Sequence, residues 1–391
     1  MQGNFIYSNP TRLYFGDAAQ QHLVQALKAY GPVVLLTYGG GSIKQNGIYD
    51  EMRAALAEAG KTVVELPGVM PNPTVDKLLE GVQLARKHKV DLILAVGGGS
   101  TIDYAKGVAV AAGYDGDPWE HFWLEQAEPA ADAPVIPVGA VLTMAGTGSE
   151  MNGGSVITHP GQKLKIGKVF GEAVFPKFAV LNPRYTFSVP QWHMVAGIYD
   201  VMSHIMEQYF SGSDDNTSDY LAEGLMRSLI AASRVAVKDP ENYEARSNIM
   251  WASTWALNTL IGKGKDQDWM VHMIGQAIGA YTDATHGMTL SGVSVAYYKF
   301  IMDAGLPKFA RFARNVWGIP ADGKSEQELA CAGIEALGAW IREIGAASEI
   351  RSLGVTEDML EGIADATLIM TDGYKVLSRA DVVEILRQSL A

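Results

Sequence analysis

The chain has 391 residues, of which 48% are hydrophobic and 19% charged, with a formal net charge of −12. This length accommodates two domains, and the composition is that of an ordinary globular protein. The negative charge is spread along the chain without a basic block, which argues against nucleic acid or an anionic membrane as the main partner.

The sequence gives an expectation for the location of the protein and for the role of its cysteine. The N-terminus has no charged region followed by an apolar stretch, and no run of 18 apolar residues occurs. We therefore expect a cytoplasmic protein. The single cysteine, Cys331, excludes an internal disulfide framework. Its flanking residues resemble a helix core, which predicts a packed, small apolar residue.

Short apolar runs followed by glycine-bearing turns mark the first half as alternating strands and helices. We predict buried parallel strands at residues 32–37, 91–96 and 135–142. Amphipathic stretches at 20–29 and 74–89 have the spacing of crossover helices. Residues 180–183 look like the end of the last strand.

The pattern changes near residue 185. Ser188 is a candidate N-cap with Pro190 in the first helical turn, and long helical segments follow it to the C-terminus. The sequence therefore predicts an α/β domain with a parallel sheet over residues 1–185, followed by an all-α domain over residues 186–391.

Three glycine-bearing turns follow the predicted strands, at residues 38–42, 97–103 and 143–150. Glycines between a strand and a helix let backbone N–H groups approach a phosphate, and the helix dipole favours its charge. None has the GxGxxG fingerprint or a P-loop, and Ser100 with Asp103 also fits a simple capping box. Because strand carboxyl ends share one sheet edge, the three turns together predict a dinucleotide site.

Four residues of the second half have the composition of a mononuclear metal site: Asp200, His204, His272 and His286. Three imidazoles and one carboxylate can hold a divalent metal and leave coordination positions open for substrate.

Each of these residues also has an ordinary structural explanation. Asp200 and His204 are one helical turn apart, but their helix face also carries other polar residues, so a solvated polar stripe explains the pair. His272 lies among apolar residues, where a buried neutral histidine with a hydrogen-bond partner is the alternative. His286 lies past the end of that helix, where a loop can turn back to a site.

The motifs together resemble the iron-dependent (group III) alcohol dehydrogenase family, in particular its NADP-preferring aldehyde reductase and butanol dehydrogenase branch. The matching segments extend nearly end to end: 9–16, 97–103, 147–150, 267–269 and 283–287. The resemblance implies a dehydroquinate synthase-like fold, with a dinucleotide-binding α/β domain and a helical metal-binding domain. It also implies that Asp200, His204, His272 and His286 bind one divalent metal, Fe²⁺ or Zn²⁺.

The resemblance also assigns the cofactor contacts. It places Gly97, Gly98, Gly99 and Ser100 around the pyrophosphate with Asp103 nearby, Thr143 and Thr147 beside the nicotinamide, Lys165 near the ribose, and Gly39, Gly40, Gly41 and Ser42 at the adenosine ribose. NAD-preferring members carry an acidic residue near the position of Gly40. Ser42 and Lys44 can instead donate to a 2′-phosphate, so we predict NADP over NAD.

These assignments predict a metal-dependent NAD(P)H alcohol dehydrogenase or aldehyde reductase that interconverts primary alcohols and aldehydes. The metal would act as a Lewis acid on the substrate oxygen while the nicotinamide exchanges a hydride. Many relatives place a second histidine four residues after the third ligand, whereas this chain has Gln276, which cannot titrate near neutrality. We therefore expect a proton relay that differs from that of these relatives. The family implies a homodimer or larger assembly.

Two other functions remain open from the residues. One is a dehydroquinate synthase-like lyase that uses a metal and NAD, and the other is a non-catalytic metal and nucleotide sensor. The segment 271–281 and the nearby tryptophans Trp251, Trp255 and Trp269 are apolar rather than basic, which argues against a phosphorylated substrate and favours aliphatic or aromatic aldehydes. Intact ligands argue against a sensor.

Overall fold

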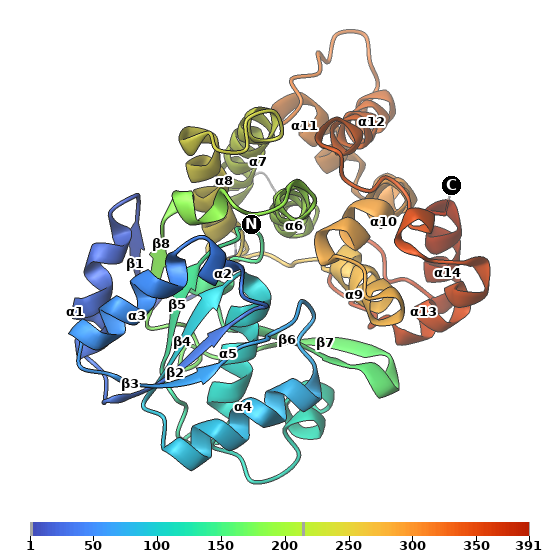
Figure 1. The fold of residues 1–391 in the computed structure, drawn as a ribbon. Coiled ribbons are helices and arrows are strands. Elements are labelled where there is room, and N and C mark those ends of the chain that lie inside the picture. Colours follow the sequence, from blue (N-terminus) through green and yellow to red (C-terminus); the bar gives the residue numbers. More distant parts are fainter. Residues whose placement is uncertain (1–2, 213–215, 391) are drawn as a thin grey trace. The chain divides into compact units, whose positions relative to one another are not determined.

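The computed structural model describes residues 3–212 and 216–390, which form two compact units (Figure 1). One unit, Ser8–Val189, is an α/β domain. The other comprises the chain from Pro190 onward and also the N-terminal segment up to Tyr7. The sequence predicted a change at 185/186 and did not predict that the N-terminal segment belongs to the helical unit.

A six-stranded parallel sheet forms the centre of the α/β unit, in the order β1-β8-β5-β4-β2-β3. Its strands are β1 (Arg12–Phe15), β2 (Val33–Tyr38), β3 (Thr62–Leu66), β4 (Leu92–Gly97), β5 (Val138–Leu142) and β8 (Phe178–Leu181). Helices cover both faces, so β2, β4 and β5 are buried on both sides and appear in the sequence as continuous apolar runs. The three strands predicted from those runs are confirmed, with β5 shorter at its start. The edge strands β1 and β3 are only partly buried, and each contains a charged residue, so neither appears as a continuous apolar run.

Helices of the α/β unit lie in two layers around this sheet. They are α1 (Leu23–Lys28), α2 (Ser42–Gln45), α3 (Ile48–Glu58), α4 (Val75–His88) and α5 (Gly99–Ala111). Five short helices accompany them: η1 (Ala19–His22), η2 (Trp119–Leu124), η3 (Ser149–Met151), η4 (Pro160–Gln162) and η5 (Pro183–Thr186). The strands β6 (Gly154–His159) and β7 (Leu164–Val169) form a separate antiparallel hairpin. Apolar side chains of α1 and α3 pack on one face of the sheet, and α5 packs on β4 and β5 from the other. The predicted helix at 74–89 is confirmed, with Thr74 as its N-cap.

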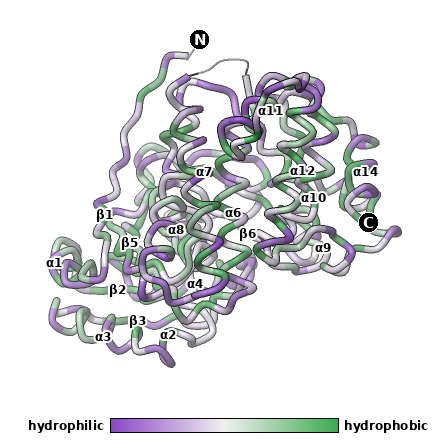
Figure 2. Tube along the Cα trace, turned by 90° about the horizontal axis from the view of Figure 1, so that it is seen from above, coloured by the Kyte–Doolittle hydropathy of each residue, from purple (hydrophilic) through white to green (hydrophobic). Residues whose placement is uncertain are grey.

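The helical unit is built around α6 (Gln191–Tyr209), which is buried over most of its length and packs against α7, α8, α9 and α10. The other helices are α7 (Thr217–Ala236), α8 (Tyr243–Ala256), α9 (Met270–Thr282), α10 (His286–Ile301), α11 (Leu306–Asn315), α12 (Glu326–Ile344), α13 (Leu360–Ala366) and α14 (Arg379–Gln388), with short η helices at Met302–Gly305, Arg351–Leu353 and Glu357–Met359. In Figure 2, α7 and α12 alternate between hydrophilic and hydrophobic residues along the trace, as expected of amphipathic helices. Within the described residues, no helix is both long and apolar enough to span a bilayer.

Two local predictions are wrong. Ser188 does not cap α6, because the last non-helical residue is Pro190 and the Ser188 hydroxyl instead accepts a hydrogen bond from Asn46. Cys331 lies in α12 as expected but is exposed, because the neighbouring Leu329, Ala330 and Ile334 form the buried face of that helix.

Candidate functional site

The polar face of α6 points into the helical unit. Asp200 and His204 are each 4% exposed, and Glu207 and Gln208 on the same side of the helix are also buried. A solvated polar stripe is therefore not the explanation for Asp200 and His204. Buried polar groups require partners, so the surroundings of this face indicate what it binds.

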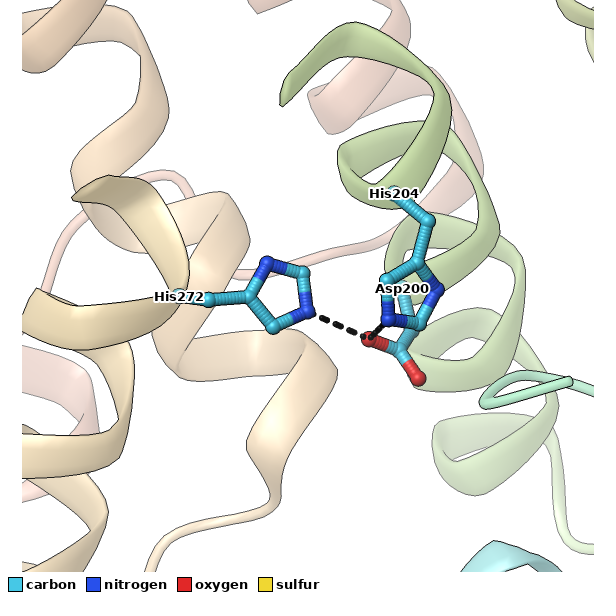
Figure 3. Close-up of side chains that lie close together, drawn as sticks. All are labelled: Asp200, His204 and His272. Atoms are coloured by element: carbon cyan, nitrogen blue, oxygen red, sulfur yellow. Dashed lines mark ion pairs between the residues drawn. The ribbon is translucent and has the colours of Figure 1, made fainter. Parts of the chain in front are cut away.

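Three imidazoles converge on one carboxylate oxygen. The Nε2 atoms of His272, His204 and His286 lie 3.5, 3.7 and 3.8 Å from Asp200 Oδ1 (Figure 3 shows the first two). Metal–nitrogen bonds of about 2.0–2.1 Å place neighbouring tetrahedral ligand atoms about 3.3 Å apart. The separations found here are close to that value and longer than ordinary hydrogen bonds.

The ligand atoms themselves are consistent with a metal. Asp200 Oδ1 and His272 Nε2 are buried and have no hydrogen-bond partner within the described part of the chain. Asp200, His204 and His272 can also bring one ligand atom each within 4.8 Å of one another. His286 completes the predicted set from a more open position, with its side chain 24% exposed. These donors fit a divalent cation with N and O ligands.

Aromatic packing holds two of the imidazoles. The rings of His204 and His272 stack with centroids 4.6 Å apart, and the Trp269 ring lies edge-on to both, at 6.1 and 5.4 Å. Trp269 precedes α9 and has a left-handed backbone, with φ of 66°. Such a conformation is unusual for a bulky residue and indicates a position that the surrounding structure imposes.

A close helix contact sets the position of His286, which is the first residue of α10 and not part of a loop. The next residue, Gly287, lies against α6. A Cβ atom at Gly287 would come within 1.9 Å of the Ala196 carbonyl oxygen. Glycine is therefore required here for α10 to approach α6 closely enough to bring His286 near Asp200.

The charges of the cluster are strongly coupled. Burial raises the pKa of Asp200, but the imidazoles of His204, His272 and His286 outweigh this and hold it below its usual range. Burial likewise lowers the pKa of His272, but the carboxylates of Glu207 and Asp200 outweigh this and raise it to about 9. The site thus favours positive charge between its carboxylates.

The sequence analysis did not identify Glu207 as a site residue. Glu207 is fully buried on α6 and contacts His272 on the side of the ring opposite Nε2. The available signal was its position seven residues after Asp200, which places it on the same helix face. Gln276, by contrast, lies on α9 one turn after His272, as predicted, and is 7% exposed.

The predicted cofactor loops lie at the carboxyl ends of adjacent strands in the α/β unit. Residues 39–42 follow β2, residues 98–100 follow β4, and residues 143–150 follow β5, with β4 paired to both neighbours. The capping-box explanation for Ser100 and Asp103 is wrong, because α5 begins after Gly98. Intrahelical bonds begin at the Thr101 N–H, so the N–H groups of Gly99 and Ser100 belong to the unsatisfied first turn that suits an anion.

The glycines of these loops differ in their surroundings. A Cβ at Gly99 would come within 2.2 Å of the Thr147 side chain, so this glycine lets two of the loops meet. A Cβ at Gly40 would meet nothing within 4 Å. The first loop is thus open where the second is closely packed.

Two predicted cofactor residues have protein partners. Asp103 is buried and accepts hydrogen bonds from the Ser149 hydroxyl and the Val156 N–H, which tie α5 to η3 and β6. Lys165 on β7 donates to the Asn72 side chain at 2.7 Å. Their contact with a cofactor stays a prediction.

A charged cluster that the sequence analysis did not anticipate lies beside the first loop. The Lys44 ammonium lies over the rings of Tyr38 and Tyr49, at 5.2 and 4.6 Å. Both phenols donate to Glu65 on β3, at 2.9 and 2.6 Å. The hydrogen bond from Tyr49 is the main factor that lowers the pKa of Glu65.

Family models match both units. The model of the iron-containing alcohol dehydrogenases matches residues 10–183, and that of the C-terminal domain of the same family matches residues 194–390. The chain belongs to the iron-containing alcohol dehydrogenase family. The resemblance inferred from the sequence and the expected fold are thereby confirmed.

Relatives of this alcohol dehydrogenase cover nearly its full length. It is 38% identical to NADH-dependent butanol dehydrogenase A of Clostridium acetobutylicum over 99% of both chains, and 38% identical to the NADPH-dependent aldehyde reductase YqhD of Escherichia coli over 90% of this chain and 89% of YqhD. Among solved structures, NADH-dependent butanol dehydrogenase A from Thermotoga maritima matches with a TM-score of 0.94 and 35% identity, covering 100% of this chain and 99% of that one. The chain is therefore an NAD(P)H-dependent alcohol dehydrogenase or aldehyde reductase.

Proposed function

We propose that this alcohol dehydrogenase is an NADP-preferring, metal-dependent reductase of small aliphatic or aromatic aldehydes. The convergence of three imidazole Nε2 atoms on Asp200 Oδ1 is the observation that carries the metal dependence. When bound, a divalent cation would supply Lewis acidity toward a carbonyl oxygen, and the nicotinamide would supply the hydride.

The residues of the chain would have separate roles in the reaction. Asp200, His204, His272 and His286 would hold the cation, which the three-imidazole, one-carboxylate set allows to be Fe²⁺ or Zn²⁺. Gln276, one helical turn from His272, can orient a polar group through its amide but cannot release a proton near neutrality. The apolar residues of α9 favour an apolar substrate chain.

Coenzyme preference rests on the loop after β2. NADH-dependent butanol dehydrogenase A of Clostridium acetobutylicum is 38% identical over 99% of this chain, and the NADPH-dependent reductase YqhD is 38% identical over 90% of it. Relatives of both preferences thus exist, and the proposal relies on the chain's own side chains. Lys44 is an exposed cation held over two tyrosines beside an open Gly40. Glu65, the nearby carboxylate, is engaged by those tyrosines rather than directed at the loop. This arrangement favours a 2′-phosphate over a free ribose hydroxyl.

A single set of measurements tests the proposal. Protein purified without oxygen is assayed for metal content, then kcat/KM is measured for NADPH and NADH with butyraldehyde, hexanal and benzaldehyde. We expect about one equivalent of Fe or Zn and a higher kcat/KM for NADPH. Equal or greater efficiency with NADH would refute the coenzyme preference, and full activity in metal-free protein would refute the metal dependence.

A further inference from the structure

Glu207 holds His272 by two hydrogen bonds and is itself held by a third. Its Oε1 accepts from the Nδ1–H of the His272 imidazole, and its Oε2 accepts from the His272 backbone N–H at 3.0 Å. The Ser203 hydroxyl, one turn earlier on α6, donates to Oε1 at 2.6 Å. One carboxylate therefore fixes both the ring and the backbone of a single residue.

The backbone bond anchors the start of α9. His272 is the third residue of that helix, where the N–H has no intrahelical acceptor. The residue before the helix, Trp269, supplies no side-chain cap. Glu207 thus caps α9 from α6, and it joins two of the three helices that carry metal-site residues.

The ring bond sets which nitrogen of His272 faces Asp200. A buried carboxylate accepts a hydrogen bond, so Nδ1 carries a hydrogen and Nε2 is the nitrogen left to offer its lone pair to a metal. Nε2 is the atom that lies 3.5 Å from Asp200 Oδ1. A histidine held in this way presents a fixed, more basic nitrogen to a metal.

Charge balance supports the same role. Glu207 has 0% exposure, and among the described residues its ion pair is with His272 and with no lysine or arginine. Asp200 and Glu207 together place two negative charges in a buried region, and a divalent cation would balance both.

We propose that Glu207 is the positioning residue of the metal centre, which selects the His272 tautomer and raises metal affinity without touching the metal or the substrate. The proposal rests on the proposed metal site. It assigns Ser203 the supporting role of orienting Oε1.

The test compares Glu207→Gln with a matched buried carboxylate. Glu223 on α7 is also buried and hydrogen-bonded, by Tyr209 and Asn315, but contacts none of the metal-site residues in the described structure. The affinity for Zn²⁺ is measured by chelator competition, and the visible absorption of the Co²⁺-loaded protein reports ligand geometry. Thermal unfolding of the metal-free proteins reports structural damage.

We expect Glu207→Gln to lower Zn²⁺ affinity about 10- to 100-fold and to change the Co²⁺ spectrum. Glu223→Gln should lower the metal-free unfolding temperature but leave affinity within about twofold and the spectrum unchanged. Glu207→Asp, which keeps the charge, should recover part of the affinity.

Two outcomes would overturn the assignment. One is a folded Glu207→Gln protein with wild-type affinity and spectrum. If Glu207→Gln does not fold, Ser203→Ala becomes the deciding variant: a loss of a few-fold in affinity supports the proposal, and an unchanged affinity refutes it. Failure of the wild-type protein itself to bind Zn²⁺ or Co²⁺ would instead refute the metal site and the proposed function.

Discussion

The two units prepare their sites by opposite means. In the helical unit, side chains converge and each is held by a close contact: Glu207 on His272, Trp269 on two imidazoles, and Gly287 against Ala196. In the α/β unit, the candidate cofactor loops consist largely of glycine and backbone at the ends of neighbouring strands. A metal needs fixed donor atoms, whereas a dinucleotide needs space and N–H groups. Substitutions should therefore affect the two sites differently.

The largest effect should come from removing a ligand. We expect His272→Ala or His286→Ala to abolish metal retention and aldehyde reduction, because the site loses one of its four donor atoms and with it the coordination geometry. His193→Ala, on the same helix as Asp200 but outside the cluster, is the control and should keep its metal. Metal content after dialysis against a weak chelator measures the result, and an active, metal-free His286→Ala protein would refute the assignment.

Substitution by alanine, which adds one methyl group, should distinguish the closely packed glycines from the open ones. Gly287→Ala would collide with the Ala196 carbonyl, displace His286, and lower metal affinity by about 10-fold or more together with the unfolding temperature. Gly224→Ala in α7 meets nothing within 4 Å and should leave both unchanged or raise stability slightly, since alanine favours helix. Equal effects of the two substitutions would show that the contact between α10 and α6 does not set the site.

The open loop should respond to charge rather than to size. Gly40→Ala should be tolerated, whereas Gly40→Asp should lower kcat/KM for NADPH at least about tenfold through repulsion of the 2′-phosphate. Lys44→Ala should cost about tenfold for NADPH and little for NADH, because it removes a charge-assisted contact. If Lys44→Ala lowers kcat/KM equally for NADPH and NADH, Lys44 does not contact the 2′-phosphate.

The smallest effect should be a change in a pH profile. Gln276→His places a titratable imidazole one turn from His272, and we expect kcat to gain a dependence on pH near 6 to 7 with little change at its maximum. The wild-type profile should be flatter over the same range. Identical profiles would mean that this position takes no part in proton transfer.

The sequence predicted features that a local pattern restricts and missed features that depend on distant residues. The four candidate ligands could be proposed because the family resemblance assigns them, and the structure brings their side chains together. Strands β2 and β4 could be predicted because burial on both faces leaves an apolar run. Glu207 was not identified because its partner His272 is 65 residues away, and on α6 it looks like one more polar residue. The edge strand β3, and with it Glu65 beside Lys44, was missed because β3 is only partly buried and Glu65 interrupts its apolar run.

Trp269 shows what the metal centre demands of the rest of the chain. A left-handed backbone disfavours a side chain of this size by about 1–2 kcal/mol, and glycine would adopt it freely. Replacing Trp269 with glycine would relax the backbone and remove the ring that rests against His204 and His272. Residue 269 is thus a compromise: glycine would suit the backbone, but an aromatic ring is needed to keep the two imidazoles in place.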